Sequence, residues 1–116
     1  MKKRHVIALL FCTLMLTACG GGKPRYMDNQ TYELAKRAVE TMQDYLNTEL
    51  SAQEAYNKMD SIHNRLSELE ISTYKANHYN EMLTIQTSGI RALLAMDDAN
   101  RVYEEMKEMK EYIGMK

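Results

Sequence analysis

Residues 47–54 read Asn47-Thr48-Glu49-Leu50-Ser51-Ala52-Gln53-Glu54, and this stretch decides how the chain folds. Its first four residues interrupt the apolar pattern that precedes them. Ser51 followed three residues later by Glu54 is the pattern of a capping box, in which each side chain bonds the backbone N–H of the other residue. The stretch therefore ends one helix and begins the next. Two helices joined by so short a connection normally lie antiparallel as an αα-hairpin.

Apolar residues recur at helical spacing on both sides of this stretch. The first segment, with Asp28 or Asn29 as its N-cap, has its apolar residues at Ala35, Val39, Met42 and Leu46, with Ala38 and Tyr45 alongside. The second has steps of three and four through Ala52, Ala55, Met59, Ile62, Leu66 and Leu69. Strand-like alternation is poor, and residues 29–113 contain no Pro and one Gly. The pattern predicts an all-α chain.

The C-terminal part of the chain allows two interpretations. The pattern resets near residue 71, and Ser72 or Thr73 caps the next helix. That helix carries a broad apolar face: Tyr79, Met82, Leu83, Ile85, Ile90, Leu93 and Leu94. Asp97 and Asp98 suit the start of a separate last helix, because acids are favourable at an N-terminus. Alternatively, one helix spans 73–113, because the following residues align without a slip: Ile85, Gly89, Ala92, Met96, Ala99, Tyr103 and Met106. We therefore expect an antiparallel bundle of three or four helices over 29–116.

The first nineteen residues have the parts of an export signal. Residues 1–5 are basic, an apolar run of about eleven residues follows, and Leu16-Thr17-Ala18-Cys19 leads into three glycines. The apolar run is too short to span a bilayer, which needs about twenty apolar residues. An ordinary secretory signal cut after Ala18 would leave Cys19 as a free thiol.

The segment Leu16-Thr17-Ala18-Cys19 resembles the lipobox of bacterial lipoproteins, in which an aliphatic residue and two small residues precede a Cys. The resemblance covers only the leader and implies that residues 1–18 are a signal peptide, cut between Ala18 and Cys19. It also implies a diacylglyceryl group on the Cys19 sulfur and an N-acyl chain on the new amino terminus. Gly at position 20, in place of Asp, implies the outer membrane where the cell has one, and otherwise the outer face of the cell membrane.

The residues after the leader suggest a short tether and an acidic body. Residues 19–28 comprise Cys19 and a segment with three glycines and Pro24, which favour flexibility over helix. Without the leader's Lys2, Lys3 and Arg4, the 15 basic residues become 12 against 16 acids, a formal charge of −4. That sign disfavours nucleic acid as a partner. It also gives no support for attraction to anionic lipid, so membrane attachment is expected to come from the acyl chains.

Few residues have the arrangement that a catalytic or metal site needs. The mature chain would have only Cys19, so neither an intramolecular disulfide nor a Cys-based metal site could form. A metal or ligand site would depend on His63 and His78, which lack the spacing of a helical ligand pair. No Ser stands in a nucleophile motif, and neighbouring acids such as Glu104 and Glu105 diverge by about 100° on a helix. We therefore expect no metal site, no cofactor and no enzymatic activity.

The tyrosines are the remaining residues that suggest a function. The chain has eight Tyr, all after the leader, and no Trp. Tyr suits half-buried positions where the ring packs and the hydroxyl stays wet. It is also enriched at protein interfaces, as is Met. Boundary packing and a recognition face therefore remain alternatives, and the candidate face is Tyr56, Tyr74 and Tyr79.

Together these observations favour a lipid-anchored, non-enzymatic interaction module at the cell envelope. Its partners would be the membrane, through the lipid, and a protein or another envelope component. A small-ligand or metal-binding lipoprotein that uses the bundle interior is the alternative function.

Overall fold

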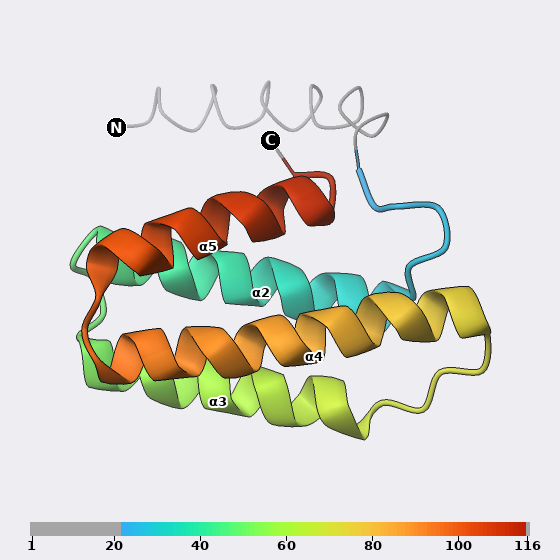
Figure 1. Cartoon of the computed structure of the whole chain (residues 1–116), viewed down its shortest axis with the longest axis horizontal. Coiled ribbons are helices and arrows are strands. Elements are labelled where there is room, and N and C mark those ends of the chain that lie inside the picture. The colour runs from blue at the N-terminus through green and yellow to red at the C-terminus, as the bar shows by residue number, and fades with distance from the viewer. Residues whose placement is uncertain (1–21, 116) are drawn as a thin grey trace, which may run out of the picture.

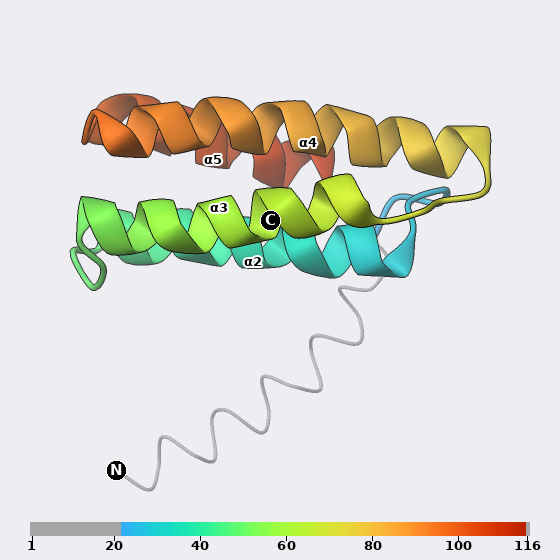
Figure 2. The same ribbon diagram turned by 90° about the horizontal axis from the view of Figure 1, so that it is seen from below.

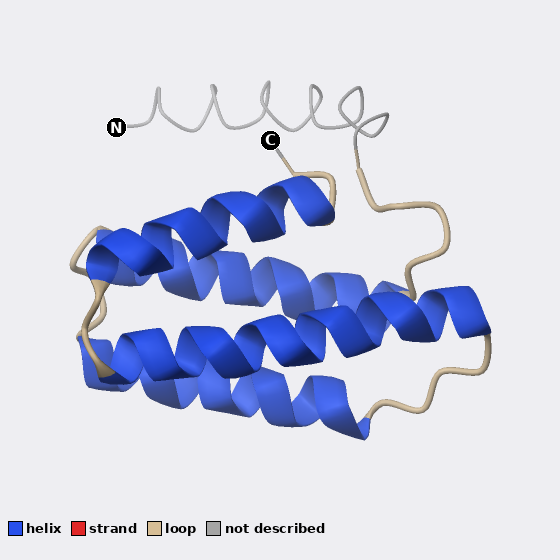
Figure 3. Cartoon of the chain, in the orientation of Figure 1, coloured by secondary structure: helices blue, strands red, loops and turns tan. Residues whose placement is uncertain are grey.

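The computed structural model describes residues 22–115 and consists of helices joined by short loops (Figure 1). The four helices are α2 (Asn29–Leu46), α3 (Ala52–Glu68), α4 (Tyr74–Ala95) and α5 (Ala99–Tyr112). They form two layers, with α2 beside α3 and α4 beside α5 (Figure 2). Each helix contacts the next one along the chain, and α5 returns to contact α2. The prediction of an all-α antiparallel bundle is confirmed, with four helices within residues 22–115; Figure 3 shows these helices joined by loops.

The helix starts follow the capping chemistry of the sequence. Asp28, and not Asn29, caps α2 by accepting from the N–H groups of Gln30 and Thr31. At α3 both bonds of the predicted capping box are present, at 3.1 Å and 2.9 Å. Thr73, and not Ser72, caps α4. These local bonds satisfy N–H groups that a helix start otherwise leaves unpaired.

The interpretation of residues 73–113 as one continuous helix is wrong. The chain leaves α4 at Met96, Asp97 takes a positive φ of 54°, and Asp98 caps α5 through the N–H of Arg101. The residues whose alignment favours continuity lie mostly on the outside of the bundle: exposed are Ile85, Gly89, Ala92, Met96, Ala99 and Tyr103. An exposed row needs no continuous helix behind it, whereas the turn allows α5 to fold back and bury Val102, Met106 and Met109.

The core is formed by the facing sides of the four helices. Its largest fully buried side chains include Met42, Met59, Leu66, Leu83 and Leu94. Met27 is also only 2% exposed, although we expected it in the flexible tether. Its N–H donates to the Pro24 carbonyl, and its own carbonyl accepts from Lys23 Nζ at 2.8 Å. The body therefore begins before residue 28, because a buried thioether holds this end of the tether against the bundle.

The hydroxyl of a buried tyrosine ties the α4–α5 turn to the end of α2. Tyr45 is 7% exposed, and its hydroxyl donates to Asp97 Oδ1 at 2.5 Å. Burial, the hydrogen bond to Asp97 and the charges of Asp97 and Asp98 raise the pKa of Tyr45 to about 12. The bond requires the protonated hydroxyl, so it links the stability of the bundle to alkaline pH.

We expect the free energy of unfolding to fall between about pH 10 and pH 12, by roughly 2 kcal/mol. Below that window Tyr45 keeps its proton in both states, so the bond contributes fully. Within it the unfolded chain loses the proton first, which favours unfolding. Urea unfolding at several pH values measures the effect. Tyr45→Phe should remove this part of the alkaline loss, whereas Tyr103→Phe, which removes an exposed hydroxyl, should keep it. An unchanged alkaline loss in Tyr45→Phe would show that another group is responsible.

Candidate functional site

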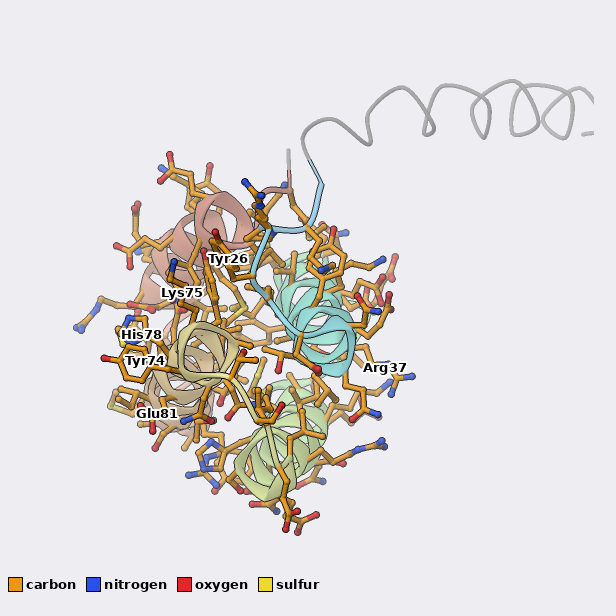
Figure 4. All side chains as sticks on the ribbon, turned by 90° about the vertical axis from the view of Figure 1, so that its right-hand side faces the viewer. Tyr26, Arg37, Tyr74, Lys75, His78 and Glu81 are labelled. Atoms are coloured by element: carbon orange, nitrogen blue, oxygen red, sulfur yellow. The ribbon has the colours of Figure 1, made fainter. Side chains whose placement is uncertain are left out.

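The structure brings together two of the three tyrosines of the predicted face. Tyr74 and Tyr79 line one shallow hollow of about 390 Å³ with Tyr26, Lys75 and His78. We call these five residues the tyrosine hollow. Tyr74 is 84% exposed and Tyr26 is 48% exposed, so neither ring is needed to fill the core. Figure 4 shows the labelled Tyr26, Tyr74, Lys75 and His78 on one side of the bundle end, with Arg37 on the other.

Tyr56, the third tyrosine of the predicted face, does not line this hollow. It packs half-buried against the core near the start of α3. Asp60, one turn later, accepts from Arg91 Nη1 at 2.6 Å, which fixes the start of α3 beside the end of α4. Tyr74 begins α4 and lies roughly 25 Å from Arg91 along the helix, at about 1.5 Å per residue. The antiparallel arrangement therefore places Tyr56 and Tyr74 at opposite ends of the bundle.

The electrostatics of the tyrosine hollow depend on cations beside a ring. Lys75 Nζ lies 4.3 Å from the centroid of the Tyr26 ring, and Arg25 Cζ lies 5.5 Å from the same centroid. These distances are those of cation–π contacts, because the ring face is electronegative. Tyr26 is carried by the tether and Lys75 by α4, so the hollow lies where the tether, held by the buried Met27, meets the bundle.

A second hollow lies between α4 and α5. Its volume is about 330 Å³, and we call it the α4–α5 groove; it is lined by Met82, Ile85, Gln86, Glu105, Glu108 and Tyr112. Met82 is 42% exposed and Ile85 is 66% exposed, whereas both were expected on the buried face of α4. The core takes Asn80 and Thr87 in their place. Carboxylates border this apolar floor, and Glu105 accepts from Gln86 Nε2 at 3.3 Å.

The two hollows adjoin through a pair of rings. Tyr79 of the tyrosine hollow and Tyr112 of the α4–α5 groove have ring centroids 5.4 Å apart, tilted by 51°. This is within the range of favourable aromatic pairs. Burial, and then the neighbouring Tyr79, raise the pKa of the Tyr112 hydroxyl. The result is an aromatic and thioether surface that runs from the tether along α4.

The two histidines do not share a site. His63 Nδ1 lies 3.0 Å from Thr87 Oγ1, so this ring is occupied by a contact between α3 and α4. His78 lines the tyrosine hollow, roughly 13 Å along α4 from Thr87. Within residues 22–115, no three residues of the His, Cys, Asp and Glu types gather closely enough to hold a metal ion. The ligand pair expected for a metal site is therefore not brought together.

Sequence reasoning missed most of this surface. The sequence pattern places Tyr26 in a tether and Met82 and Ile85 on the apolar face of a helix, and it gives no role to Lys75. One feature of the sequence indicates that Met82 and Ile85 are not core residues. A row at helical spacing, with steps of four and three, runs through residues 76, 80, 83, 87, 90 and 94. Met82 and Ile85 lie outside this row. The row does not look like a buried side, because two of its members are the polar Asn80 and Thr87. The predicted signal peptide, with Ala18 and Cys19, lies outside the described residues.

Comparison with known proteins adds no relative. No family model, no curated protein and no solved structure matches the chain. Of the helices within residues 22–115, none has both the length and the apolar character that a membrane span requires.

Proposed function

We propose that the chain is a bacterial lipoprotein whose four-helix body is a non-enzymatic interaction module at the cell envelope. The membrane is its first partner, through acyl chains on Cys19. A protein or another envelope component is its second partner, bound at the α4–α5 groove. The proposed location is the extracytoplasmic side, on the outer membrane if the cell has one. The anchor is supported by the sequence Leu16-Thr17-Ala18-Cys19 alone.

The proposal of a partner bound at the α4–α5 groove is supported by the exposure of Met82 and Ile85. At 42% and 66% exposed, they leave apolar surface in water beside the Tyr79–Tyr112 ring pair. Single exposed apolar residues are common, but a contiguous group with a polar rim is typical of an interaction site. The rim of the groove is acidic at Glu105 and Glu108, which favours a partner surface that combines apolar side chains with Lys or Arg.

The alternative of a ligand or metal site in the bundle interior has less support. The interior positions are filled by residues with no exposed surface, among them Met42, Met59, Leu83 and Leu94. His63 is engaged by Thr87, and His78 lies at the surface. No observation favours this function over binding at the outer face.

Site-specific photo-crosslinking in the native cell tests the groove. A photoreactive residue in place of Ile85 should give a discrete adduct, because Ile85 lies on the floor of the groove. The matched control is the same residue in place of Met96, which is 63% exposed but lies at the α4–α5 turn. Met82→Glu should remove the adduct at position 85 by adding a charge to the apolar floor. Equal adducts at both positions, or none at position 85, would contradict binding at this groove.

A further inference from the structure

We propose that the tyrosine hollow rests on the headgroup layer of the membrane that holds Cys19, so that this end of the bundle faces the lipid. The inference rests on the proposed lipidation of Cys19. A lipid surface would cover Tyr74 and Tyr26, which are 84% and 48% exposed in the single chain.

The length of chain before the bundle limits how far this end can be from the membrane. Tyr26 follows Cys19 by seven residues, which span at most roughly 25 Å when fully extended. Tyr26 is also fixed to the body, because its neighbour Met27 is 2% exposed within the core. The other end of α4, a helix of 22 residues, is roughly 33 Å farther along the bundle. An acylated Cys19 therefore keeps the tyrosine hollow within roughly 25 Å of the lipid, whereas the opposite end can lie roughly 33 Å farther away.

The side chains of the hollow suit a membrane interface. Tyr concentrates at the boundary between headgroups and acyl chains, because its ring is apolar and its hydroxyl is polar. Lys75 Nζ lies 4.3 Å from the Tyr26 ring and Arg25 lies on the same ring at 5.5 Å, so two cations sit beside the aromatic surface. Cations close to an anionic lipid surface are attracted to it. The hollow thus combines apolar rings with groups that pair with lipid phosphates.

The charge of the body is uneven along its length. Near the tether, residues 22–28, 69–78 and 110–115 carry four basic and three acidic side chains, a formal charge of +1. At the opposite end, residues 44–54 and 96–101 carry five acidic side chains and Arg101, a formal charge of −4. An anionic surface repels the second end and not the first. The overall charge of −4 gives no support for attraction to anionic lipid, but the charge of +1 near the tether does not oppose contact between the tyrosine hollow and such a surface.

Fluorescence quenching on vesicles tests the orientation. The mature chain has no Trp, so Tyr74→Trp supplies a single reporter on α4, and Tyr103→Trp supplies a matched one near the start of α5. Tyr103 is also exposed, at 46%, with Lys107 Nζ 5.1 Å from its ring. Each lipidated protein is reconstituted in vesicles of phosphatidylcholine and phosphatidylglycerol that contain a headgroup spin label. Quenching by the label is normalised to quenching by acrylamide.

We expect several-fold stronger quenching of the reporter at position 74 than of the one at position 103. Adding Lys75→Glu should lower the quenching at position 74, as should replacing phosphatidylglycerol with phosphatidylcholine. Equal quenching at both positions, with a measured mass that includes the lipid on Cys19, would overturn this inference and leave the proposed lipoprotein intact. A measured mass without lipid would overturn both proposals.

Discussion

The Cys19→Ser variant is expected to lose all incorporation of labelled fatty acid and the mass added by the lipid. The proposed lipidation joins a diacylglyceryl group to the sulfur, and the thiolate is the nucleophile that a hydroxyl cannot replace. Two acyl chains give stable membrane binding, with about 0.8 kcal/mol for each buried CH₂ group, so their loss removes most of the affinity. With the leader exchanged for an ordinary cleavable signal, the Cys19→Ser protein should be recovered in the soluble fraction.

The leader provides a matched control for this substitution. Cys12 is the only other Cys of the chain and lies within the apolar run of the predicted signal peptide. Cys12→Ser makes the same chemical change seven residues earlier, and it should leave labelling, cleavage after Ala18 and membrane retention as they are. Full labelling of Cys19→Ser, or loss of labelling in both variants, would refute the assignment of Cys19 as the acylated residue.

The Ile90→Ala variant should have the largest effect on folding. Ile90 has no exposed surface, and removal of a buried Ile side chain costs about 2–5 kcal/mol. That is a large share of the roughly 5–15 kcal/mol that stabilises a domain. For a domain of this size we expect a melting temperature lower by at least roughly 8 °C. Thermal and urea unfolding, followed by far-UV circular dichroism, measure both quantities.

Ile85→Ala is the matched control, because it makes the same change five residues earlier on α4. Ile85 is 66% exposed, so its substitution should change stability by no more than about 0.5 kcal/mol. The same variant should weaken the crosslink proposed for the α4–α5 groove when the photoreactive residue stands at Met82. Comparable destabilisation by the two variants would mean that the side of α4 assigned to the core is wrong.

The local structure of this chain could be predicted because its signals act over a few residues. The Ser51–Glu54 capping box and the interruption at residues 47–50 fix the α2–α3 hairpin through bonds of short range. The helical spacing of Ala55, Met59, Ile62 and Leu66 fixes the buried side of α3. The lipobox resemblance is likewise a short pattern, and it remains a prediction.

The division of residues 73–113 into α4 and α5 shows where such signals become insufficient. Asp97 and Asp98 favoured a break, while the aligned row from Ile85 to Met106 favoured continuity. Burial decides between them, because most of that row is exposed and the break allows α5 to pack on α2. The bond from Tyr45 to Asp97 joins residues 52 positions apart, and no local pattern indicates it.

The sequence by itself thus predicted an all-α chain, the capping-box start of α3 and the candidate lipid attachment at Cys19. Only the tertiary structure decided which side of α4 is buried, because apolar residues surround that helix. Its core positions include Asn80, whose amide donates to Thr31 Oγ1 and the Leu66 carbonyl, and Thr87, which contacts His63. These polar groups can be buried because other helices supply their partners. The same packing leaves Met82 and Ile85 in solvent and brings Tyr26 beside Lys75, so the candidate surfaces result from long-range contacts.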